Sequence, residues 1–435
     1  MDAPEVRRDL DRAAGLCEAF EERYKGKLAE IAAGPDGGAG LAAAIAGFES
    51  VEDLMGRLGS FAGLIYSGDT SDPARAKFYG DLQDRLTAIS THLLFFALEL
   101  NRLDDALLES ALRDAALAVY RPWLEDLRLE RPYQLEDRIE RLFHEKSVTG
   151  RGAWNRLFDE TLASLAFDVD GEKLTLETTL NRLVDPDEAR RKAAADALAA
   201  TFRENLRLFT LVTNVLAKDK AISDEWRGFG DVAAARHLSN RVEPEVVDAL
   251  VAAVSEAYPR LSHRYYALKA RWLGKDRLEH WDRNAPLPET INRTVPWDEA
   301  RDTVLSAYRG FAPEMASIAS RFFDGSWIDA PTRPGKAPGA FAHPTVPSVH
   351  PYVLLNYQGK TRDVMTLAHE LGHGVHQVLA AGQGLLMSQT PLTLAETASV
   401  FGEMLTFRSM LERAENPRER KIMLAGKVED MINTV

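Results

Sequence analysis

Cysteine is scarce in this sequence: Cys17 is the single one among 435 residues, which excludes an internal disulfide framework. Long apolar runs are also absent, so no segment is predicted to cross a membrane. The start of the chain, Met1 to Arg8, leads into a charged amphipathic helix and lacks the apolar core of an export signal. We therefore expect a cytoplasmic protein without a membrane partner, in which Cys17 is a small packed residue.

A surplus of positive charge is missing as well. Lys and Arg number 53 against 66 Asp and Glu, and the net charge of -13 argues against broad nucleic-acid affinity, because phosphate binding needs clustered basic side chains. The basic run Arg190 to Lys192 has acids nearby and predicts a solvated helix face. The sequence shows no internal repeat or low-complexity tail, and it leaves the oligomeric state unknown.

Helical periodicity is what the sequence has in abundance, and 45% of its residues are hydrophobic, enough for a sizeable core. The fold class predicted from this pattern is mainly α. A glycine-rich stretch, Gly34 to Gly38, predicts a break after the first helix. The predicted helices are 4–33, 49–66, 72–103, 104–128, 186–224, 243–273 and 297–323.

Around Phe167 to Leu176 the hydrophobic period changes to two across an Asp170-Gly171 turn, which predicts a hairpin or a strand and a loop. We place a domain boundary at this change. It separates an N-terminal helical lobe, residues 1–165, from a second lobe, residues 166–435, which carries the motifs described next.

The motif His369-Glu370-Leu371-Gly372-His373 carries the strongest chemical signal. Two His residues four apart on a helix face the same way and can hold one metal ion, and the Glu between them lies where it can take a proton from water at the open metal position. The alternative is a set of polar residues on a solvated helix face. A helix is supported by an apolar stripe of Val364, Ala368, Leu371, Val375 and Val378.

A catalytic zinc site usually has three protein ligands and a fourth position for water or substrate, so a further ligand is expected downstream. Glu396 follows His373 at a distance that lets the first helix end, a loop at Gly382 to Gly384 turn, and a second helix run back. Glu403 lies two turns farther on the same face. It is either an outer partner that orients a ligand His or a surface carboxylate.

Three other residues of the helix that carries the His-Glu-x-x-His motif bear on the site. His376 lies on the same stripe as the two motif His residues, and we expect it to pack or to support the ligands rather than to bind the metal. Gly372 and Gly374 each cost roughly 1 kcal/mol of helix propensity against Ala. We therefore expect another segment to approach the helix closely at these glycines.

These residues resemble the oligoendopeptidase F family of thimet-oligopeptidase-like zinc metallopeptidases. Leu367 to His376 is similar to that family's signature helix, and Ala395 to Glu403 is similar to its third-ligand helix. Gly339 to Phe341 and His350 to Tyr357 match the strands before the motif. The resemblance covers most of the chain from about Phe167 onward and, more loosely, the helical first part. Upstream it includes Asn214 to Lys220, Arg227-Gly228, Trp281-Asp282 and Ala285 to Leu287.

The resemblance implies a helical zincin-type fold with a small β-sheet beside the active-site helix and a deep substrate cleft. It implies His369, His373 and Glu396 as ligands of one Zn²⁺ per chain, and Glu370 as general base. Members of the family continue beyond Val435 into a segment whose Tyr and His residues bind the oxyanion. We therefore expect a C-terminally truncated chain, in which family membership and activity are separate questions.

The predicted strands near 339–343 and 351–357 follow a Pro- and Gly-rich segment, 331–338, and suggest how a substrate is held. An exposed strand edge can pair with an extended peptide through its backbone. By the resemblance, Gly339, Ala340 and Phe341 would bind the peptide in this way. The alternative is a structural edge strand covered by a loop. For His343 and His350 we expect hydrogen-bonded structural roles.

The function predicted from these features is that of a zinc metalloendopeptidase, an oligopeptidase that cuts internal bonds of short peptides. Two alternatives stay open. One is a zinc carboxypeptidase of related helical fold, and the other is a metal- or peptide-binding protein that is inactive because the C-terminal segment is missing.

Overall fold

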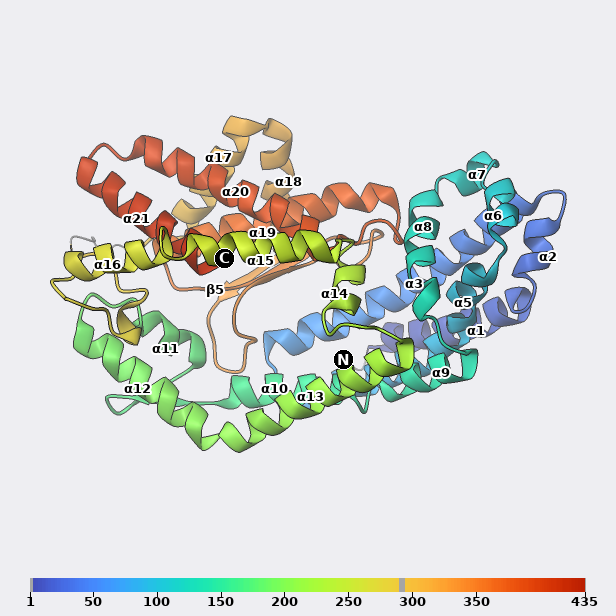
Figure 1. Ribbon diagram of the computed structural model, residues 1–435, viewed down its shortest axis with the longest axis horizontal. Helices are drawn as coiled ribbons and strands as arrows, with labels where there is room; N and C mark the ends of the chain where they lie inside the picture. Colours follow the sequence, from blue (N-terminus) through green and yellow to red (C-terminus); the bar gives the residue numbers. More distant parts are fainter. Residues whose placement is uncertain (1–2, 289–293, 435) are drawn as a thin grey trace.

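Helices dominate the computed structural model, which describes residues 3–288 and 294–434, and the prediction of a mainly α fold is confirmed (Figure 1). The helices of the first part of the chain are α1 (Pro4–Tyr24), α2 (Leu28–Ala33), α3 (Gly37–Gly68), α4 (Pro73–Ser90), α5 (Leu94–Arg102), α6 (Asp105–Ala111), α7 (Ala115–Ala118), α8 (Arg121–Leu129), α9 (Asp137–Lys146) and α10 (Arg151–Ser164).

The first helices bury one continuous apolar core, whose residues are spread from Leu10 to Leu124. Aromatic rings form its centre, where Phe20 packs edge-on against Phe96 with 5.1 Å between ring centroids. Cys17 is fully buried in this core, as expected for a small packed residue.

The predicted helix 4–33 is divided into α1 and α2, which corrects the prediction. Gly26 adopts a left-handed conformation with φ of 75°, and its N–H donates to Glu99 Oε1 at 2.7 Å. A helix cannot continue through that backbone, so the chain turns before Leu28 starts the next helix.

The predicted break at Gly34 to Gly38 is shorter than expected, because α3 already begins at Gly37 and runs for 32 residues. Close packing explains the glycine here. A Cβ added to Gly38 would lie 2.3 Å from Asp114 Cβ, so only glycine allows the start of α3 to approach the segment between α6 and α7.

Polar residues and proline divide most of the other predicted helices. The Asp104 and Asp114 side chains accept backbone N–H groups at the starts of α6 and α7, so the predicted helix 104–128 becomes three shorter ones. The predicted helix 297–323 breaks at Ala312, because the following Pro313 disfavours a helical residue before it.

A hairpin and more helices follow, and a three-stranded sheet lies before the last helices. Among the residues that the structure describes, no helix combines the length and the apolar character needed to cross a bilayer. The elements are β1 (Phe167–Val169), β2 (Glu172–Leu174), α11 (Leu176–Arg182), α12 (Glu188–Glu204), α13 (Leu206–Arg227), α14 (Ala234–Ser239), α15 (Pro244–Ala257), α16 (Ser262–Trp272), α17 (Trp297–Phe311), α18 (Pro313–Asp324), β3 (Ile328–Pro331), β4 (Phe341–His343), β5 (Tyr352–Tyr357), α19 (Thr361–Ala380), α20 (Leu392–Arg413) and α21 (Pro417–Thr434). Short 3₁₀ turns are η1 (Thr91–Leu93), η2 (Arg131–Tyr133), η3 (His280–Asp282) and η4 (Ala381–Gln383).

The predicted hairpin is confirmed: β1 and β2 pair antiparallel, with Phe167 opposite Leu174. Asp170 and Gly171 both have positive φ, 54° and 84°, as in the tight two-residue turn that the Asp-Gly sequence predicts. Phe167 belongs to a small buried cluster separate from the first core. The boundary between residues 1–165 and 166–435 stays a prediction.

The three-stranded sheet has the order β3-β5-β4, with β3 parallel and β4 antiparallel to β5. The last two strands were predicted from sequence and β3 was not. Its four residues, Ile328 to Pro331, are too few to show a period of two and end in proline, which cannot donate to a strand partner.

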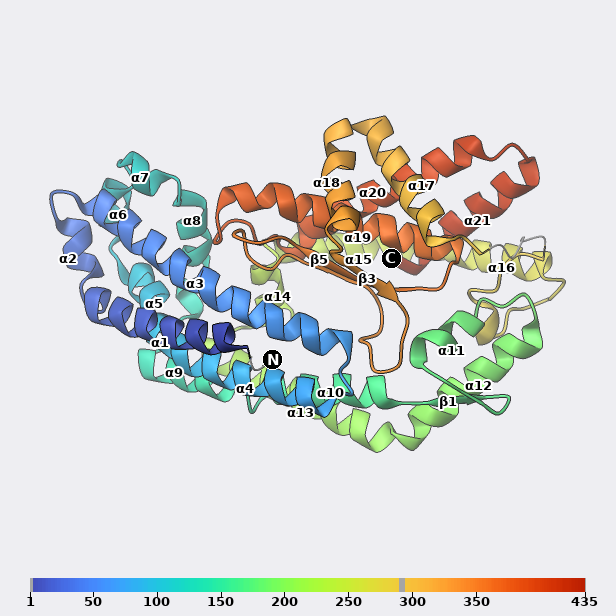
Figure 2. The ribbon, with the colours of Figure 1, turned by 180° about the vertical axis from the view of Figure 1, so that it is seen from behind.

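Helix α3 is bonded to the loop between β3 and β4, so the first helical core and the sheet are joined. Ala337 N–H donates to Ser67 O at 2.9 Å, and Thr70 N–H donates to Gly335 O at 2.7 Å. Figure 2 shows the end of α3 beside this loop. In both views α12 and α13 lie on the opposite side of the molecule from α17 to α21.

Candidate active site

Helix α19 carries the His-Glu-x-x-His motif and is fixed by its apolar stripe. Val364, Ala368, Leu371 and Val375 are each at most 5% exposed and belong to one buried cluster with β5 and α18. The predicted helix and its buried face are therefore confirmed. The ligand candidates lie on the neighbouring, half-buried side of the same helix.

Glycines bring α19 and α20 into backbone contact. A Cβ added to Gly372 would lie 2.6 Å from Ala398 O and 2.8 Å from Ser399 Cα, so no other residue fits there without a shift. Gly374 faces the Phe322 ring in the same way, with 2.6 Å from an added Cβ to the ring. The predicted close approach of another segment is confirmed at both positions.

This close approach brings His369, His373 and Glu396 together. Glu396 Oε2 lies 3.2 Å from His369 Nε2 and 3.4 Å from His373 Nε2, and one ligand atom from each residue falls within 4.8 Å of the others. Ligand atoms held at about 2.1 Å in a tetrahedron are about 3.4 Å apart. The separations and the two-nitrogen, one-carboxylate donor set fit a zinc ion.

Ser399 orients the carboxylate of Glu396. Its Oγ lies 2.7 Å from Glu396 Oε2, the same oxygen that faces both imidazoles, and Ser399 is fully buried. The hydroxyl thus holds an otherwise half-exposed carboxylate in one orientation. Ser399 was not predicted from the sequence, although its place three residues after Glu396, about one helical turn, was a signal.

Glu403 lies beside His369, as its spacing suggested. Its Oε2 is 3.4 Å from His369 Nδ1, and its Oε1 forms an ion pair with Lys427 of α21. Burial opposes the charged form of Glu403, but the hydrogen bonds from His369 and Lys427 outweigh it and lower its pKa to about 2. Lys427 was missed, because nothing in the local sequence links it to Glu403.

The imidazole of His369 responds to the same neighbours. Burial lowers the pKa of His369, but the hydrogen bond to Glu403 and the charges of Glu370, Glu396 and Glu403 raise it by more, so the net shift is upward. His376 is half-buried and is not one of the three residues of the metal cluster.

Glu370 points away from solvent and is only 6% exposed. Burial is the largest influence on its carboxyl group and, with the charge of Glu396, raises the pKa to about 7, against the lowering effects of His369 and the Ala342 N–H. A carboxyl group with such a pKa can both take up and release a proton near neutral pH.

The outer edge of β4 faces α19 at Ala342. Its C=O accepts from Gln377 Nε2 at 3.0 Å and so faces α19 rather than β5. Among the predicted substrate residues Gly339, Ala340 and Phe341, the first has backbone groups that are already bound within the protein. Gly339 N–H donates to Glu177 Oε1 at 2.7 Å and its C=O accepts from Asn356 Nδ2 at 2.9 Å, so both Gly339 groups are engaged.

His343 and His350 have structural surroundings, in line with the prediction. His343 Nε2 lies 2.9 Å from Ser60 Oγ, and burial lowers the pKa of the ring. The His350 ring stacks on Trp327 with 3.8 Å between centroids and an angle of 8°.

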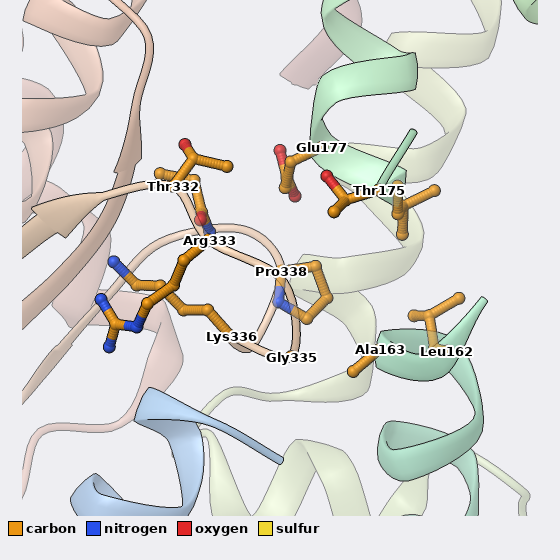
Figure 3. Close-up of a pocket in the computed structure, with 11 residues that line it drawn as sticks. Leu162, Ala163, Thr175, Glu177, Thr332, Arg333, Gly335, Lys336 and Pro338 are labelled. Atoms are coloured by element: carbon orange, nitrogen blue, oxygen red, sulfur yellow. The ribbon is translucent and has the colours of Figure 1, made fainter. Parts of the chain in front are cut away.

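A small pocket lies away from the three ligand candidates, between α10, α11 and the loop before β4 (Figure 3). Glu177 and Pro338 line it, and its volume of about 20 Å³ suits roughly one water molecule. It is too small for a peptide side chain, and it contains none of the predicted site residues.

Comparison with known proteins identifies two matching family models. Residues 183–435 match the model described as Peptidase family M3, and residues 99–167 match the model described as Oligopeptidase F. The second match ends where the hairpin begins.

Curated relatives match along most of the chain. The chain is 27% identical to "Oligopeptidase PepF" of Bacillus subtilis over 95% of its own length and 62% of that protein. It is 24% identical to "Oligoendopeptidase F homolog" of Borreliella burgdorferi over 89% of its own length and 66% of that protein. The chain thus spans less than two thirds of each of these relatives.

The fold is also found among solved structures. Oligoendopeptidase-F from Enterococcus faecium superposes with a TM-score of 0.67 at 20% sequence identity, over 99% of this chain and 70% of that one. At this identity the likeness shows the mainly α zincin-like fold with its small sheet beside α19.

Proposed function

The chain belongs to peptidase family M3, whose model covers more than half of its residues, and from this premise we propose that it is a zinc metalloendopeptidase that cuts internal bonds of short oligopeptides. The printed names of the curated relatives, oligopeptidase and oligoendopeptidase, support this substrate class. One observation carries the proposal: His369 and His373 of α19 and Glu396 of α20 converge on one point. Glu370 lies on α19 between the two His residues.

We assign one zinc ion per chain to His369 Nε2, His373 Nε2 and Glu396 Oε2. When bound, such an ion lowers the pKa of water and polarises a peptide carbonyl. The hydroxyl of Ser399 keeps Glu396 Oε2 directed at the two rings. Cobalt or manganese could replace zinc in vitro, because imidazole and carboxylate ligands accept several divalent ions.

Glu370 is assigned as general base and then general acid. It accepts the proton of the attacking water and passes it to the leaving amine of the cut bond. The Ala342 N–H, on the side of the sheet, favours the charged form of this carboxylate and so lowers its pKa against the effect of burial.

The peptide is assigned to the β4 edge, near Ala340 and Phe341. Alternate residues of a strand present their backbone groups to the same side, so the N–H and C=O of Ala340 face the same way as those of Ala342, away from β5. Gly339 marks the end of this edge, because Glu177 and Asn356 already bind its backbone.

The test measures two properties of each variant: its zinc content and its rate of cleavage of a quenched fluorescent peptide. Glu370→Gln is expected to retain zinc and to lower kcat by about 10²- to 10⁴-fold, the usual range for general acid–base catalysis. His373→Ala is expected to lose both zinc and hydrolysis. Glu412→Gln, which changes an exposed carboxylate on α20, serves as matched control and should match the wild type.

Three results would contradict or change the proposal. Full hydrolysis by zinc-loaded Glu370→Gln would exclude Glu370 as base. Zinc binding by the wild type without any turnover would favour a binding protein, and mass spectrometry that finds only C-terminal trimming would favour a carboxypeptidase.

A further inference from the structure

Lys427 reaches the candidate metal site through one carboxylate. Its Nζ forms an ion pair with Glu403 Oε1, while Glu403 Oε2 lies 3.4 Å from His369 Nδ1. The side chains of Lys427 and Glu403 are only 11% and 12% exposed, so solvent competes little for this pair.

We propose that Lys427 is a positioning residue for His369: by holding one oxygen of Glu403, it directs the other oxygen at Nδ1 and leaves Nε2 free to face Glu396. This inference rests on the proposed function, and it identifies Lys427 and Glu403 as the residues that position His369, one of the three proposed ligands. The contact of 3.4 Å is long for a hydrogen bond, so its persistence depends on how firmly Glu403 is held.

The tautomer of the imidazole explains why this matters. A neutral ring carries one N–H, on either Nδ1 or Nε2. With the proton on Nδ1, the ring donates to Glu403, and the lone pair of Nε2 would be free for a metal ion shared with Glu396 Oε2, which lies 3.2 Å from it. With the proton on Nε2, the N–H would occupy the place where a metal ion binds.

The anchoring of α21 shows that Lys427 is held from behind. On the opposite side of this helix, Glu429 Oε2 accepts from Tyr265 Oη at 2.7 Å and from the buried Lys269 Nζ at 2.5 Å, and Ala425 O lies 3.2 Å from the same Tyr265 oxygen. Residues two apart on a helix point about 200° apart. Contacts at 425 and 429 therefore turn 427 toward α20.

The experiment compares Lys427→Met with Lys427→Arg, which keeps the charge, and with Lys421→Met, a change on the same helix away from Glu403. The first readout is the ¹⁵N chemical shifts of the His369 ring at about pH 9, well above the ordinary pKa of histidine, in metal-free protein that also carries Glu396→Ala, so that no carboxylate of residue 396 faces Nε2 and Glu403 remains the acceptor at Nδ1. With Lys427 present the ring is expected to carry its proton on Nδ1, and Lys427→Met is expected to shift it toward the Nε2 form. The resonance is assigned with His369→Gln.

The second readout is zinc affinity in competition with a chromophoric chelator. Lys427→Met is expected to bind zinc about tenfold more weakly, the lower end of the effect of outer partners of metal ligands. Lys427→Arg should restore the wild-type tautomer and most of the affinity, and Lys421→Met should change neither. Thermal unfolding of each protein reports folding.

Three outcomes would overturn the inference. One is a ring protonated on Nε2 in the Glu396→Ala protein although Lys427 is present. Another is a Lys427→Met protein that keeps the wild-type tautomer and zinc affinity. The third is lowered thermal stability with no change of tautomer, which would make Lys427 a structural tie only. Because the tautomer is measured without metal, a wild type that binds no zinc or cuts no peptide contradicts the proposed function and leaves this test decisive.

Discussion

Two clusters of charged side chains in this protein are built from similar groups but differ in charge balance and in burial. In the first, buried Asp282 of η3 binds Arg191 of α12 at 2.7 Å and Lys275 at 2.5 Å, and Lys275 also binds Glu188 at 2.5 Å. Two acids meet two bases, so the charges balance within the cluster. Asp282 is fully buried and Arg191 is 3% exposed.

The second cluster is unbalanced. Glu370, Glu396 and Glu403 bring three carboxyl groups around two imidazoles, and Lys427 is the one ammonium group that pairs with them among the described residues. The ligand side chains are also half-exposed rather than sealed, with His369 at 27% and Glu396 at 56%. A balanced, buried cluster joins elements of the fold, whereas an acidic and accessible one has the charge that a divalent cation would neutralise.

The largest expected effect breaks the balanced cluster. Asp282→Ala leaves Arg191 buried without its carboxylate, and removal of one partner of a buried ion pair costs about 3–5 kcal/mol of unfolding free energy. Urea denaturation measures it. Asp298→Ala is the matched control, because Asp298 pairs with Arg301 at 79% exposure and should cost at most about 1 kcal/mol. Equal costs for the two variants would contradict the comparison.

The next prediction breaks the unbalanced cluster. Glu396→Ala removes a proposed ligand, so zinc affinity is expected to fall by more than about 100-fold, since outer partners alone account for 10- to 100-fold. The fold should be retained, because this carboxylate is half-exposed. Chelator competition and thermal unfolding measure the two properties, and a variant that unfolds while its affinity is unchanged would show the opposite division of roles.

Gly372→Ala tests the helix contact on which the second cluster depends. The added Cβ would meet backbone atoms of Ala398 and Ser399, which cannot rotate away, so α19 and α20 must separate. Overpacking of this kind costs about 1–3 kcal/mol, and zinc affinity should fall with stability. Gly382→Ala, with no atom within 4 Å of an added Cβ, is the control. Unchanged affinity in Gly372→Ala would mean that the ligands do not need the close approach.

The two clusters also differ in how many of their residues could be predicted from the sequence. The two His residues of the His-Glu-x-x-His motif lie at helical spacing, so the grouping of His369, Glu370 and His373 could be predicted from local geometry, and Glu396 from the length of a helical hairpin. Lys427 and the Arg191–Asp282 pair depend on how distant helices pack, and the residues near them carry no local signal of it. Helix positions were predicted well, but helix ends were not where capping decides them, as at Asp114.

A smaller effect is expected at Ser399, which locates Glu396 without touching the proposed ion. Ser399→Ala removes a hydrogen bond to a proposed ligand, so zinc affinity should fall by about tenfold, the lower end of the effect of outer partners of metal ligands. Ser409→Ala on the same helix is the control. If the loss appears in thermal stability and zinc binding is untouched, Ser399 is a packing residue and does not orient the ligand.

The smallest expected effect is the pH dependence of the stability that the balanced cluster contributes. Burial raises the pKa of Asp282, but hydrogen bonds from Lys275, Arg191 and the Glu279 N–H lower it more, so its folded pKa lies below the ordinary value of 3.8. A carboxyl group with a lowered pKa stabilises the fold fully above its unfolded pKa, and this contribution is lost as pH falls through the folded value. The destabilisation of Asp282→Asn relative to wild type should therefore be constant from neutral pH down to about pH 5 and shrink below about pH 4. Urea denaturation at each pH measures the difference. If the difference instead grows on acidification, the carboxylate is not what holds Arg191 and Lys275, and the balanced cluster is not a charge-compensated one.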